Sequence, residues 1–404
     1  MSPRIYSLLV AIGKITLLMG IVFLILGYIE TRNASPETGN PSSSSQPAAA
    51  DAPLIATTSP AQATTTVPAI AIASSTVSTS TPPKKPLSPT PTKQKKPALA
   101  IPRAQEVTRV QKPYNFDPIP FDTLNIQTRA ALVNILCMPR GGGSLQPISG
   151  SGVIIDPRGI ILTNAHVAQF VLLSENPAID LSCEIRTGSP ATFHFTAQVL
   201  YIPSIWVQAH ASDINTPHPT GTGEHDYALL RIVGTADSSA LPTQFPSLPF
   251  DTREAIGFLN DTVLGAGYPA EFVGGFAAEN NLFPVSSVSP ISQLLTFATS
   301  SIDMIAIGGV VEAQGGSSGG AVVNAWGRTI GIISTTSDAP TTALRDLRAI
   351  TLSYISRDLL AQTGVDLPTF LSSDPAAKEA DFNANTLPNL EKLYTQLLSS
   401  AATH

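Results

Sequence analysis

No segment narrows the possible folds of this chain more than Gln314-Gly-Gly-Ser-Ser-Gly-Gly320, in which two serines are enclosed by glycines. Glycines beside a nucleophile permit a tight turn that aims successive backbone N–H groups at one point. A serine hydroxyl reacts when a base removes its proton, and an imidazole oriented by a buried carboxylate can be that base. Two further segments supply these groups, Thr163-Asn-Ala-His-Val167 and Glu224-His-Asp-Tyr-Ala-Leu-Leu230. The candidates in chain order are His166, Asp226 and Ser318.

The order histidine, aspartate, serine is that of chymotrypsin-like double barrels and differs from the orders in subtilisin and the α/β-hydrolases. The chain resembles chymotrypsin-fold serine proteases, nearest in style to bacterial trypsin-like and HtrA-type peptidases. The resemblance covers residues 120–360 and is carried by Gly150-Ser-Gly-Val-Ile-Ile-Asp156, Gly159-Ile-Ile-Leu-Thr-Asn-Ala-His-Val167, Asp226-Tyr-Ala-Leu-Leu-Arg-Ile232 and Gly316-Ser-Ser-Gly-Gly-Ala321. HtrA proteases usually carry a PDZ domain after the protease unit. The stretch after residue 360 is too short for one, so none is expected here.

The resemblance implies a role for each candidate. Ser318 is expected to be the nucleophile, in preference to its neighbour Ser317, and His166 the general base. Asp226 is expected to orient the histidine, with Asp213 as the alternative. The donors of the oxyanion hole, which stabilises the charged intermediate, are expected to be the backbone amides of Gly316 and Ser318.

Short apolar runs separated by turn residues dominate the chain from residue 113 onward. The run 152–156, the turn 157–159 and the run 160–163 predict a hairpin. Further strands are predicted at 191–202, 227–233, 261–264, 304–307, 321–324, 329–334 and 349–353, with helices at 353–362 and 387–398. This pattern favours a barrel or sandwich. With the resemblance, we expect an all-β fold of two six-stranded antiparallel β-barrels and a C-terminal helix, the site between the barrels, and a surface insertion at 202–224.

The chain before residue 113 differs sharply in composition from the rest. Residues 1–32 contain the apolar run Ile15–Ile29, which with the apolar residues before it is long enough to span a bilayer. We therefore expect a transmembrane signal anchor with the remainder exported, or alternatively a cleaved signal peptide. Residues 33–112 are rich in Ser, Thr, Pro and Ala and contain no aromatic residue, which predicts a disordered linker. The expected protease domain spans 113–370, and a tail with a short helix spans 371–404.

Two cysteines, Cys137 and Cys183, lie in predicted strands of the exported part. An oxidising compartment permits a disulfide between them, and two buried free thiols are the alternative. Two cysteines with scattered histidines do not make a zinc site, and no metal, cofactor or nucleic acid is expected as a partner.

Specificity and function follow from the resemblance. Glu312 matches the base of the primary pocket of trypsin-like enzymes, where an acid favours Lys or Arg. Thr335 and Thr336 match the pocket wall, where they favour small residues instead, and Ser334 is expected to contact Asp226. The expected protein is a single-pass, membrane-anchored serine endopeptidase that acts on polypeptides outside the cytoplasm, in the periplasm or at the cell surface. A catalytically silent binding module and an esterase on the same fold are the alternatives.

Overall fold

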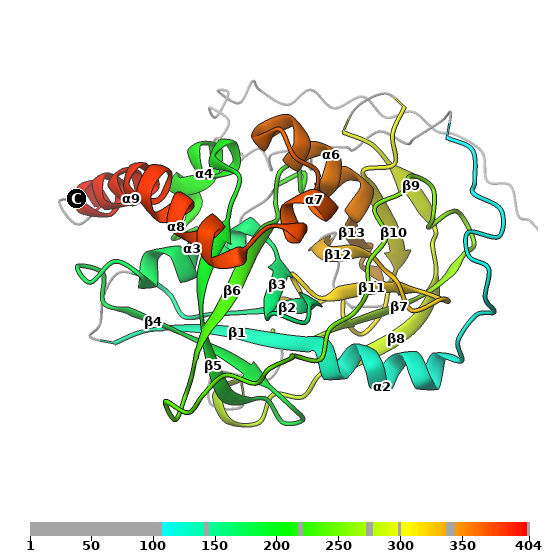
Figure 1. The fold of residues 1–404 in the computed structure, drawn as a ribbon, viewed down its shortest axis with the longest axis horizontal. Coiled ribbons are helices and arrows are strands. Elements are labelled where there is room, and N and C mark those ends of the chain that lie inside the picture. The colour runs from blue at the N-terminus through cyan, green and yellow to red at the C-terminus, as the bar shows by residue number, and fades with distance from the viewer. Residues whose placement is uncertain are drawn as a thin grey trace, which may run out of the picture. The chain divides into compact units, whose positions relative to one another are not determined.

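The computed structural model describes residues 107–140, 145–216, 221–271, 278–297, 300–336 and 344–401. The described strands form two antiparallel sheets (Figure 1). The first sheet is a closed barrel in the order β1 (Leu132–Pro139), β2 (Ile148–Asp156), β3 (Ile160–Thr163), β6 (Ala228–Thr235), β5 (Thr192–Tyr201) and β4 (Leu181–Thr187). The prediction of a six-stranded barrel is therefore confirmed for the first half of the domain.

The second sheet has seven strands in place of the predicted six, and it remains open among the described residues. Its order is β8 (Val285–Pro290), β7 (Thr262–Gly267), β11 (Ala321–Asn324), β12 (Thr329–Thr336), β13 (Leu347–Thr351), β10 (Met304–Gly308) and β9 (Gln293–Leu295). The prediction of a second six-stranded barrel is therefore wrong in strand number, while the two sheets and the C-terminal helix fit the predicted chymotrypsin-like architecture. The strand number differs because the three-residue strand β9 pairs with the free side of β10 and becomes an additional edge.

The hairpin between β2 and β3 shows how the sequence fixes a local structure. Gly159 has a φ of +85°, and its N–H donates to the carbonyl of Asp156 at 3.0 Å. A Cβ at this position would lie 2.8 Å from the ring of Phe245, so both the backbone conformation and the space require glycine. This hairpin leads the chain into β3, and the candidate histidine follows three residues after that strand.

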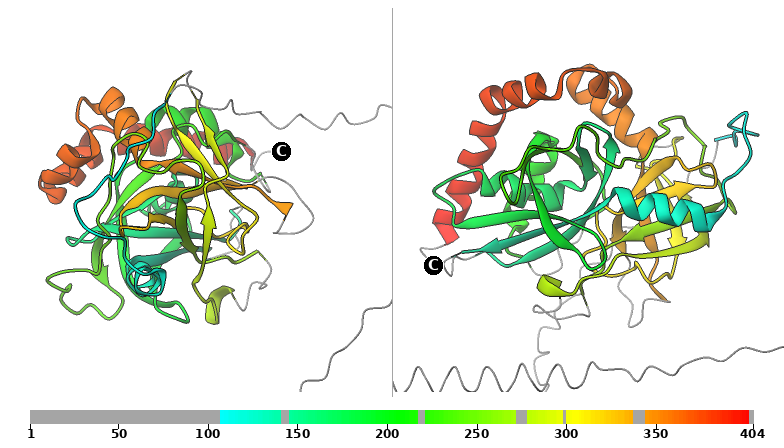
Figure 2. Two further views of the ribbon diagram at one scale, coloured as in Figure 1. Left: turned by 90° about the vertical axis from the view of Figure 1, so that its right-hand side faces the viewer. Right: turned by 60° about the horizontal axis from the view of Figure 1, so that its bottom comes forward.

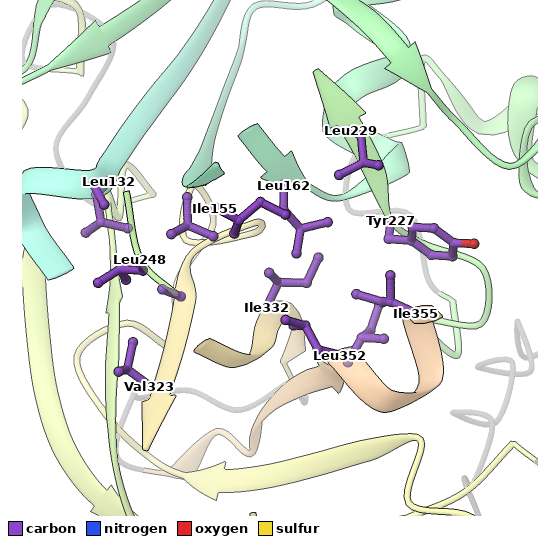
Figure 3. Close-up of a cluster of buried hydrophobic side chains, with 14 of the residues drawn as sticks. Leu132, Ile155, Leu162, Tyr227, Leu229, Leu248, Val323, Ile332, Leu352 and Ile355 are labelled. Carbon is purple, nitrogen blue, oxygen red and sulfur yellow. The ribbon is translucent and has the colours of Figure 1, made fainter. Parts of the chain in front are cut away.

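The two sheets pack against each other through a continuous apolar core, shown in Figure 3. The labelled side chains point toward one another from the first barrel, the second sheet and helix α6 (Leu352–Thr363), and they include Leu132, Ile155, Leu162, Leu229, Val323, Ile332, Leu352 and Ile355. Full burial of such a side chain stabilises the fold by about 1.5–3 kcal/mol. The loops that leave the two sheets are therefore held in fixed relative positions.

Several described helices were not expected from the sequence, among them three that pack near the two sheets. Helix α2 (Phe121–Ala131) buries Leu124, Thr128 and Ala131, which recur at helical spacing. Helix α4 (Ser204–His210), followed by the 3₁₀ turn η1 (Ala211–Asp213), lies in the segment that we expected to be a surface insertion. That expectation is wrong for this part because Trp206 and Val207 are buried in the core of the first barrel. Helix α3 (Ala165–Ser174) contains the candidate histidine in its first turn and buries most of its side chains.

Four helices end the described chain: α6, α7 (Leu367–Ser372), α8 (Pro375–Asn385) and α9 (Leu387–Ala401). Figure 2 shows them running in succession from the second sheet to the first barrel. Phe382 of α8 and Leu390 and Tyr394 of α9 are buried in the core of that barrel. The helices predicted at 353–362 and 387–398 correspond to α6 and α9.

The predicted membrane segment 1–32, and most of the predicted linker 33–112, lie outside the described residues. Within the ranges given above, no helix combines the length and apolar character that a bilayer crossing requires. Val107 and Val110, at the linker's far end, pack against the core of the second sheet.

Candidate active site

The pairing of β3 with β6 brings two of the three candidate residues together. Thr163 of β3 lies opposite Ala228 of β6, so the residues that follow β3 lie beside those that precede β6. His166 stands in the first turn of α3, and Asp226 stands just before β6. The side chain of Asn164 donates to the backbone carbonyl of Asp226 at 2.8 Å and fixes the two segments to each other.

The carboxylate of Asp226 receives three hydrogen bonds. Its Oδ2 atom lies 2.8 Å from Nδ1 of His166 and accepts from the hydroxyl of Ser334 at 2.9 Å. Its Oδ1 atom accepts from the backbone N–H of His166 at 3.0 Å, so the carboxylate also caps the N-terminus of α3. Asp226 is 5% exposed, and its donors replace the water that it has lost.

The pair shifts the protonation of both partners. Burial alone raises the pKa of Asp226, but the charge of His166 and the hydrogen bonds from His166 and Ser334 lower it below its ordinary value. Burial alone lowers the pKa of His166, but the charge of Asp226 and its hydrogen bond raise it above its ordinary value. The carboxylate therefore stays ionised, and it stabilises an imidazolium when one forms.

Ser318 lies in a turn that both sheets hold in place. Its carbonyl accepts from the N–H of Ser151 in β2 at 2.7 Å, and the next residue, Gly319, donates to the carbonyl of Ile333 at 2.7 Å. Gly319 has a φ of +86°, and a Cβ there would lie 2.0 Å from the carbonyl oxygen of Ser151. Glycine is therefore obligatory next to the candidate nucleophile.

The hydroxyl of Ser318 is directed at the carbonyl of Ser334, at 3.5 Å. Among the described residues it makes no hydrogen bond to His166. In unliganded enzymes such bonds are often long and tighten only when substrate is bound.

Two backbone donors beside Ser318 are unused. The carbonyl of Gly315 accepts from the N–H groups of Ala270 and Glu271 at 2.8 and 3.2 Å. Because C=O and N–H point in opposite directions across a trans peptide, the N–H of Gly316 points away from those residues. Within the described ranges neither Gly316 N–H nor Ser318 N–H has an acceptor, and unpaired backbone donors call for a ligand or water.

The residues predicted to determine specificity are only partly described. Glu312 is fully buried, with 0% exposure, and its Oε2 atom accepts from the hydroxyl of Ser287 at 2.5 Å. Burial raises the pKa of Glu312. Thr335 and Thr336 pair through β12 with Arg348 and Leu347 of β13, and their side chains lie outside the described part.

The other predicted residues are placed as follows. Cys137 and Cys183 lie directly opposite each other in the β1–β4 pair and are joined by a disulfide. Asp213, the alternative to Asp226, instead lies 3.4 Å from Nδ1 of His210. In the portion of the chain that the structure describes, no three His, Cys, Asp or Glu side chains converge in a way that could hold a metal ion.

Two contacts near the site were not predicted. The hydroxyl of Tyr394 in α9 donates to Gln169 at 2.8 Å, and Gln169 donates to the backbone carbonyl of His166 at 3.0 Å. Arg345 forms an ion pair with Glu271, whose carboxylate accepts from the N–H of Gly315. The members of these contacts are 225 and 74 residues apart in the chain, so no local sequence pattern could have indicated them.

Comparison with known proteins supports the architecture described here. Residues 150–332 match a family model described as the trypsin-like peptidase domain. The matched range contains all three candidate residues, together with strands from both sheets. No curated protein matches the chain.

Proposed function

Residues 150–332 form a trypsin-like peptidase domain, and on this basis we propose that the chain is a serine endopeptidase that works through an acyl-enzyme. Ser318 is the nucleophile, His166 the general base and acid, and Asp226 the carboxylate that orients the imidazole. The observation that carries the proposal is the pair formed by His166 and the buried Asp226, in which the acid engages Nδ1. With Nδ1 engaged, Nε2 is the nitrogen left to take the proton of the serine.

The geometry supports a two-stage reaction. The Ser318 hydroxyl turns from the carbonyl of Ser334 to His166, whose Nε2 takes its proton as Oγ bonds to the substrate carbonyl carbon. The resulting oxyanion is stabilised by the N–H groups of Gly316 and Ser318, each worth about 2.7–4 kcal/mol in comparable sites. Collapse breaks the C–N bond, and the imidazolium gives its proton to the leaving amine. Water then attacks the acyl-enzyme by the same route and releases the acid and free Ser318.

The edge of β12 supports a polypeptide substrate. β11 pairs with β12 only as far as Ala321 opposite Ile332, while β13 pairs with the other side of β12 through Thr336. Among the described residues, no strand therefore pairs with the backbone of residues 334–336 on the side that faces Ser318. An extended peptide can add there as a further strand through main-chain hydrogen bonds.

We also propose that the primary pocket accepts small side chains. Glu312 is fully buried, with its Oε2 atom accepting from Ser287 and its Oε1 atom without a partner among the described residues, so a substrate Lys or Arg would have to open the packing around it to reach the carboxyl. A basic side chain that does not reach the carboxyl would be a buried charge without a partner, which is costly and disfavours such a residue at this site. Small residues need no such rearrangement.

The location outside the cytoplasm, behind an N-terminal membrane anchor, is a proposal that rests on the composition of residues 1–32. The Cys137–Cys183 disulfide supports it, because disulfides persist in oxidising compartments. Membrane fractionation of cells that produce the full chain tests the proposal. We expect the protein to be recovered in the membrane pellet and to be digested by protease added outside the cytoplasmic membrane. Recovery in the soluble cytoplasm would contradict it.

The experiment that tests the activity is labelling of the full-length protein with a fluorophosphonate probe. Ser318→Ala should abolish labelling, whereas the matched variant Ser317→Ala, at a fully buried hydroxyl, should keep it. An unlabelled wild-type protein with a cooperative thermal transition would instead favour the silent binding module. Matched peptide and ester substrates separate a peptidase from an esterase, since the proposal requires cleavage of the amide.

A further inference from the structure

Three loops of the second sheet meet at one peptide group next to the candidate nucleophile. Glu271 follows β7, Gly315 precedes β11, and Arg345 precedes β13. These residues are far apart in the chain, yet one carboxylate connects all three. The Oε2 atom of Glu271 accepts from the N–H of Gly315 at 2.9 Å and lies 2.7 Å from Nη1 of Arg345.

Gly315 is held on both of its polar groups by the same short segment. Its carbonyl accepts from the backbone N–H groups of Ala270 and Glu271, and its N–H donates to the Glu271 side chain. The next residue, Gly316, has a φ of +94°, and a Cβ there would lie 2.7 Å from the backbone nitrogen of Ala270. Two consecutive glycines are conformationally permissive, so the hydrogen bonds on both sides of Gly315 help to fix the orientation of the Gly315–Gly316 peptide.

Arg345 fixes the restraining carboxylate. Its two terminal nitrogens lie 2.7 and 2.9 Å from the two oxygens of Glu271, in a bidentate pair. Nη1 also donates to the carbonyl of Ala313 at 2.8 Å and so ties the pair to the loop that carries Gly315. The side chains are only 13% and 26% exposed, which shields the pair from the screening that weakens surface ion pairs.

We propose that Glu271 and Arg345 are positioning residues for the oxyanion hole. The proposal rests on the proposed function and extends it: by holding the N–H of Gly315, the pair fixes the backbone on the N-terminal side of the Gly315–Gly316 peptide, so that the Gly316 N–H faces the developing oxyanion. Without the Glu271 carboxylate the Gln314–Gly315 peptide loses its acceptor, and rotation about the Gly315 backbone can draw the Gly315 carbonyl away from the N–H groups of Ala270 and Glu271 and withdraw the Gly316 donor. Loss of one oxyanion donor costs on the order of 10²–10³ in kcat in comparable enzymes, which sets the upper limit of the effect.

The test compares kcat, KM and thermal stability of full-length variants. Glu271→Ala should lower kcat on the order of 10²-fold with little change in KM, because the lost interaction acts in the transition state. Glu271→Gln keeps an oxygen that can accept from Gly315 and should fall between wild type and Glu271→Ala. The matched control is Glu379→Ala, which breaks an ion pair of similar burial with Arg231 on the first barrel and should leave kcat unchanged.

A charge exchange separates the hydrogen bond from the ion pair. The double variant Glu271→Arg with Arg345→Glu restores opposite charges but offers Gly315 no acceptor at position 271. We expect its thermal transition to recover toward that of wild type while kcat remains low. Recovery of kcat in this double variant, or wild-type kcat in Glu271→Ala, would overturn the proposal.

Failure of the proposed function is distinguishable from failure of this inference. A wild-type protein that does not react with the fluorophosphonate would remove both. A wild-type protein and a Glu271→Ala variant that react at the same rate would remove only the positioning role. Amide hydrogen exchange adds a readout that is independent of activity, because the Gly315 amide should exchange faster in Glu271→Ala than in Glu379→Ala.

Discussion

Removal of the Ser334 hydroxyl should destabilise the protein far more than it slows the reaction. In the structure this hydroxyl donates to Oδ2 of Asp226 at 2.9 Å, and the two side chains are 7% and 5% exposed. In Ser334→Ala the carboxylate loses one of its three donors, and there is little solvent contact to compensate. Hydrogen bonds to charged groups contribute about 1.5–3 kcal/mol, so the free energy of unfolding should fall by about that amount at pH 7.

The kinetic effect of Ser334→Ala should be smaller for a definable reason. Ser334 donates to Asp226 both when His166 is neutral and when it is protonated. Most of the free energy of this hydrogen bond is therefore the same in the ground state and in the transition state. We expect kcat/KM to fall by less than about ten-fold. A carboxylate with fewer donors is more basic and attracts the imidazolium more strongly, so the pKa of His166 should rise further. The acid limb of the pH–rate profile should therefore move to higher pH.

The stability loss in Ser334→Ala should depend on pH with a fixed sign. The folded-state pKa of Asp226 is depressed, so its contribution is present above the unfolded carboxyl pKa of about 3.9 and is lost as pH falls through the folded value. The difference between wild type and variant should shrink in that acid range.

Thermal unfolding of the purified full chain, followed between pH 7 and the acid range, measures this effect. A loss of about 1.5–3 kcal/mol corresponds to a drop of roughly 3–12 °C in Tm for a domain of this size. Ser353→Ala is the matched control, since it removes a buried serine that bonds only neutral groups and should not move the acid limb. An unchanged Tm in Ser334→Ala, or an acid limb that moves to lower pH, would refute the reasoning.

Three further predictions concern groups near the site. The reaction needs the neutral imidazole of His166, whose pKa Asp226 raises above its ordinary value of about 6.5. Wild-type kcat/KM should therefore decline as pH falls through a value above about 6.5. A pH–rate profile whose acid limb lies well below pH 6 would contradict this. Glu312→Gln should leave the preference for small side chains in a peptide-library assay unchanged, because the buried carboxyl does not face substrate; a switch away from Lys or Arg would show that it does. The hydrogen bond between His225 and Asp358, at 2.9 Å, raises the pKa of His225. This contact therefore stabilises the folded protein fully below about pH 6.5, the ordinary histidine pKa, and the contribution is lost as pH rises through the folded-state pKa. In His225→Ala the decline of Tm with rising pH should accordingly be shallower than in wild type. An equally steep decline in the variant would assign that pH dependence to another group.

Local patterns in the sequence predicted those parts of the structure that depend on neighbouring residues. The glycine at position 159 and the apolar runs on either side of it predict the β2–β3 hairpin, which the structure contains. The strand predicted at 321–324 coincides with β11. The three segments that contain His166, Asp226 and Ser318 indicated the residues that the structure brings to one region.

The features that escaped prediction depend on contacts between distant residues. Helix α2 shows apolar spacing only if Thr128 is counted as buried, and a threonine gives no such signal in a sequence. The three residues of β9 are too few to indicate from the sequence that this strand pairs with β10. The Glu271–Arg345 pair resembles any other two surface charges until the fold brings their loops together.

The burial of the last helices in the first barrel has a consequence for biosynthesis. The strands of that barrel begin at Leu132, but its core includes Tyr394, which is 0% exposed and connects through Gln169 to the backbone of His166. A chain emerging from the ribosome makes local contacts first, whereas this contact must wait until residue 394 has been synthesised. The hydrogen bonds that connect α9 through Gln169 to the backbone of His166 therefore form only after the serine and the aspartate have been synthesised. We expect the proposed hydrolase activity to appear only once α9 has docked, so that the nascent chain is not exposed to it.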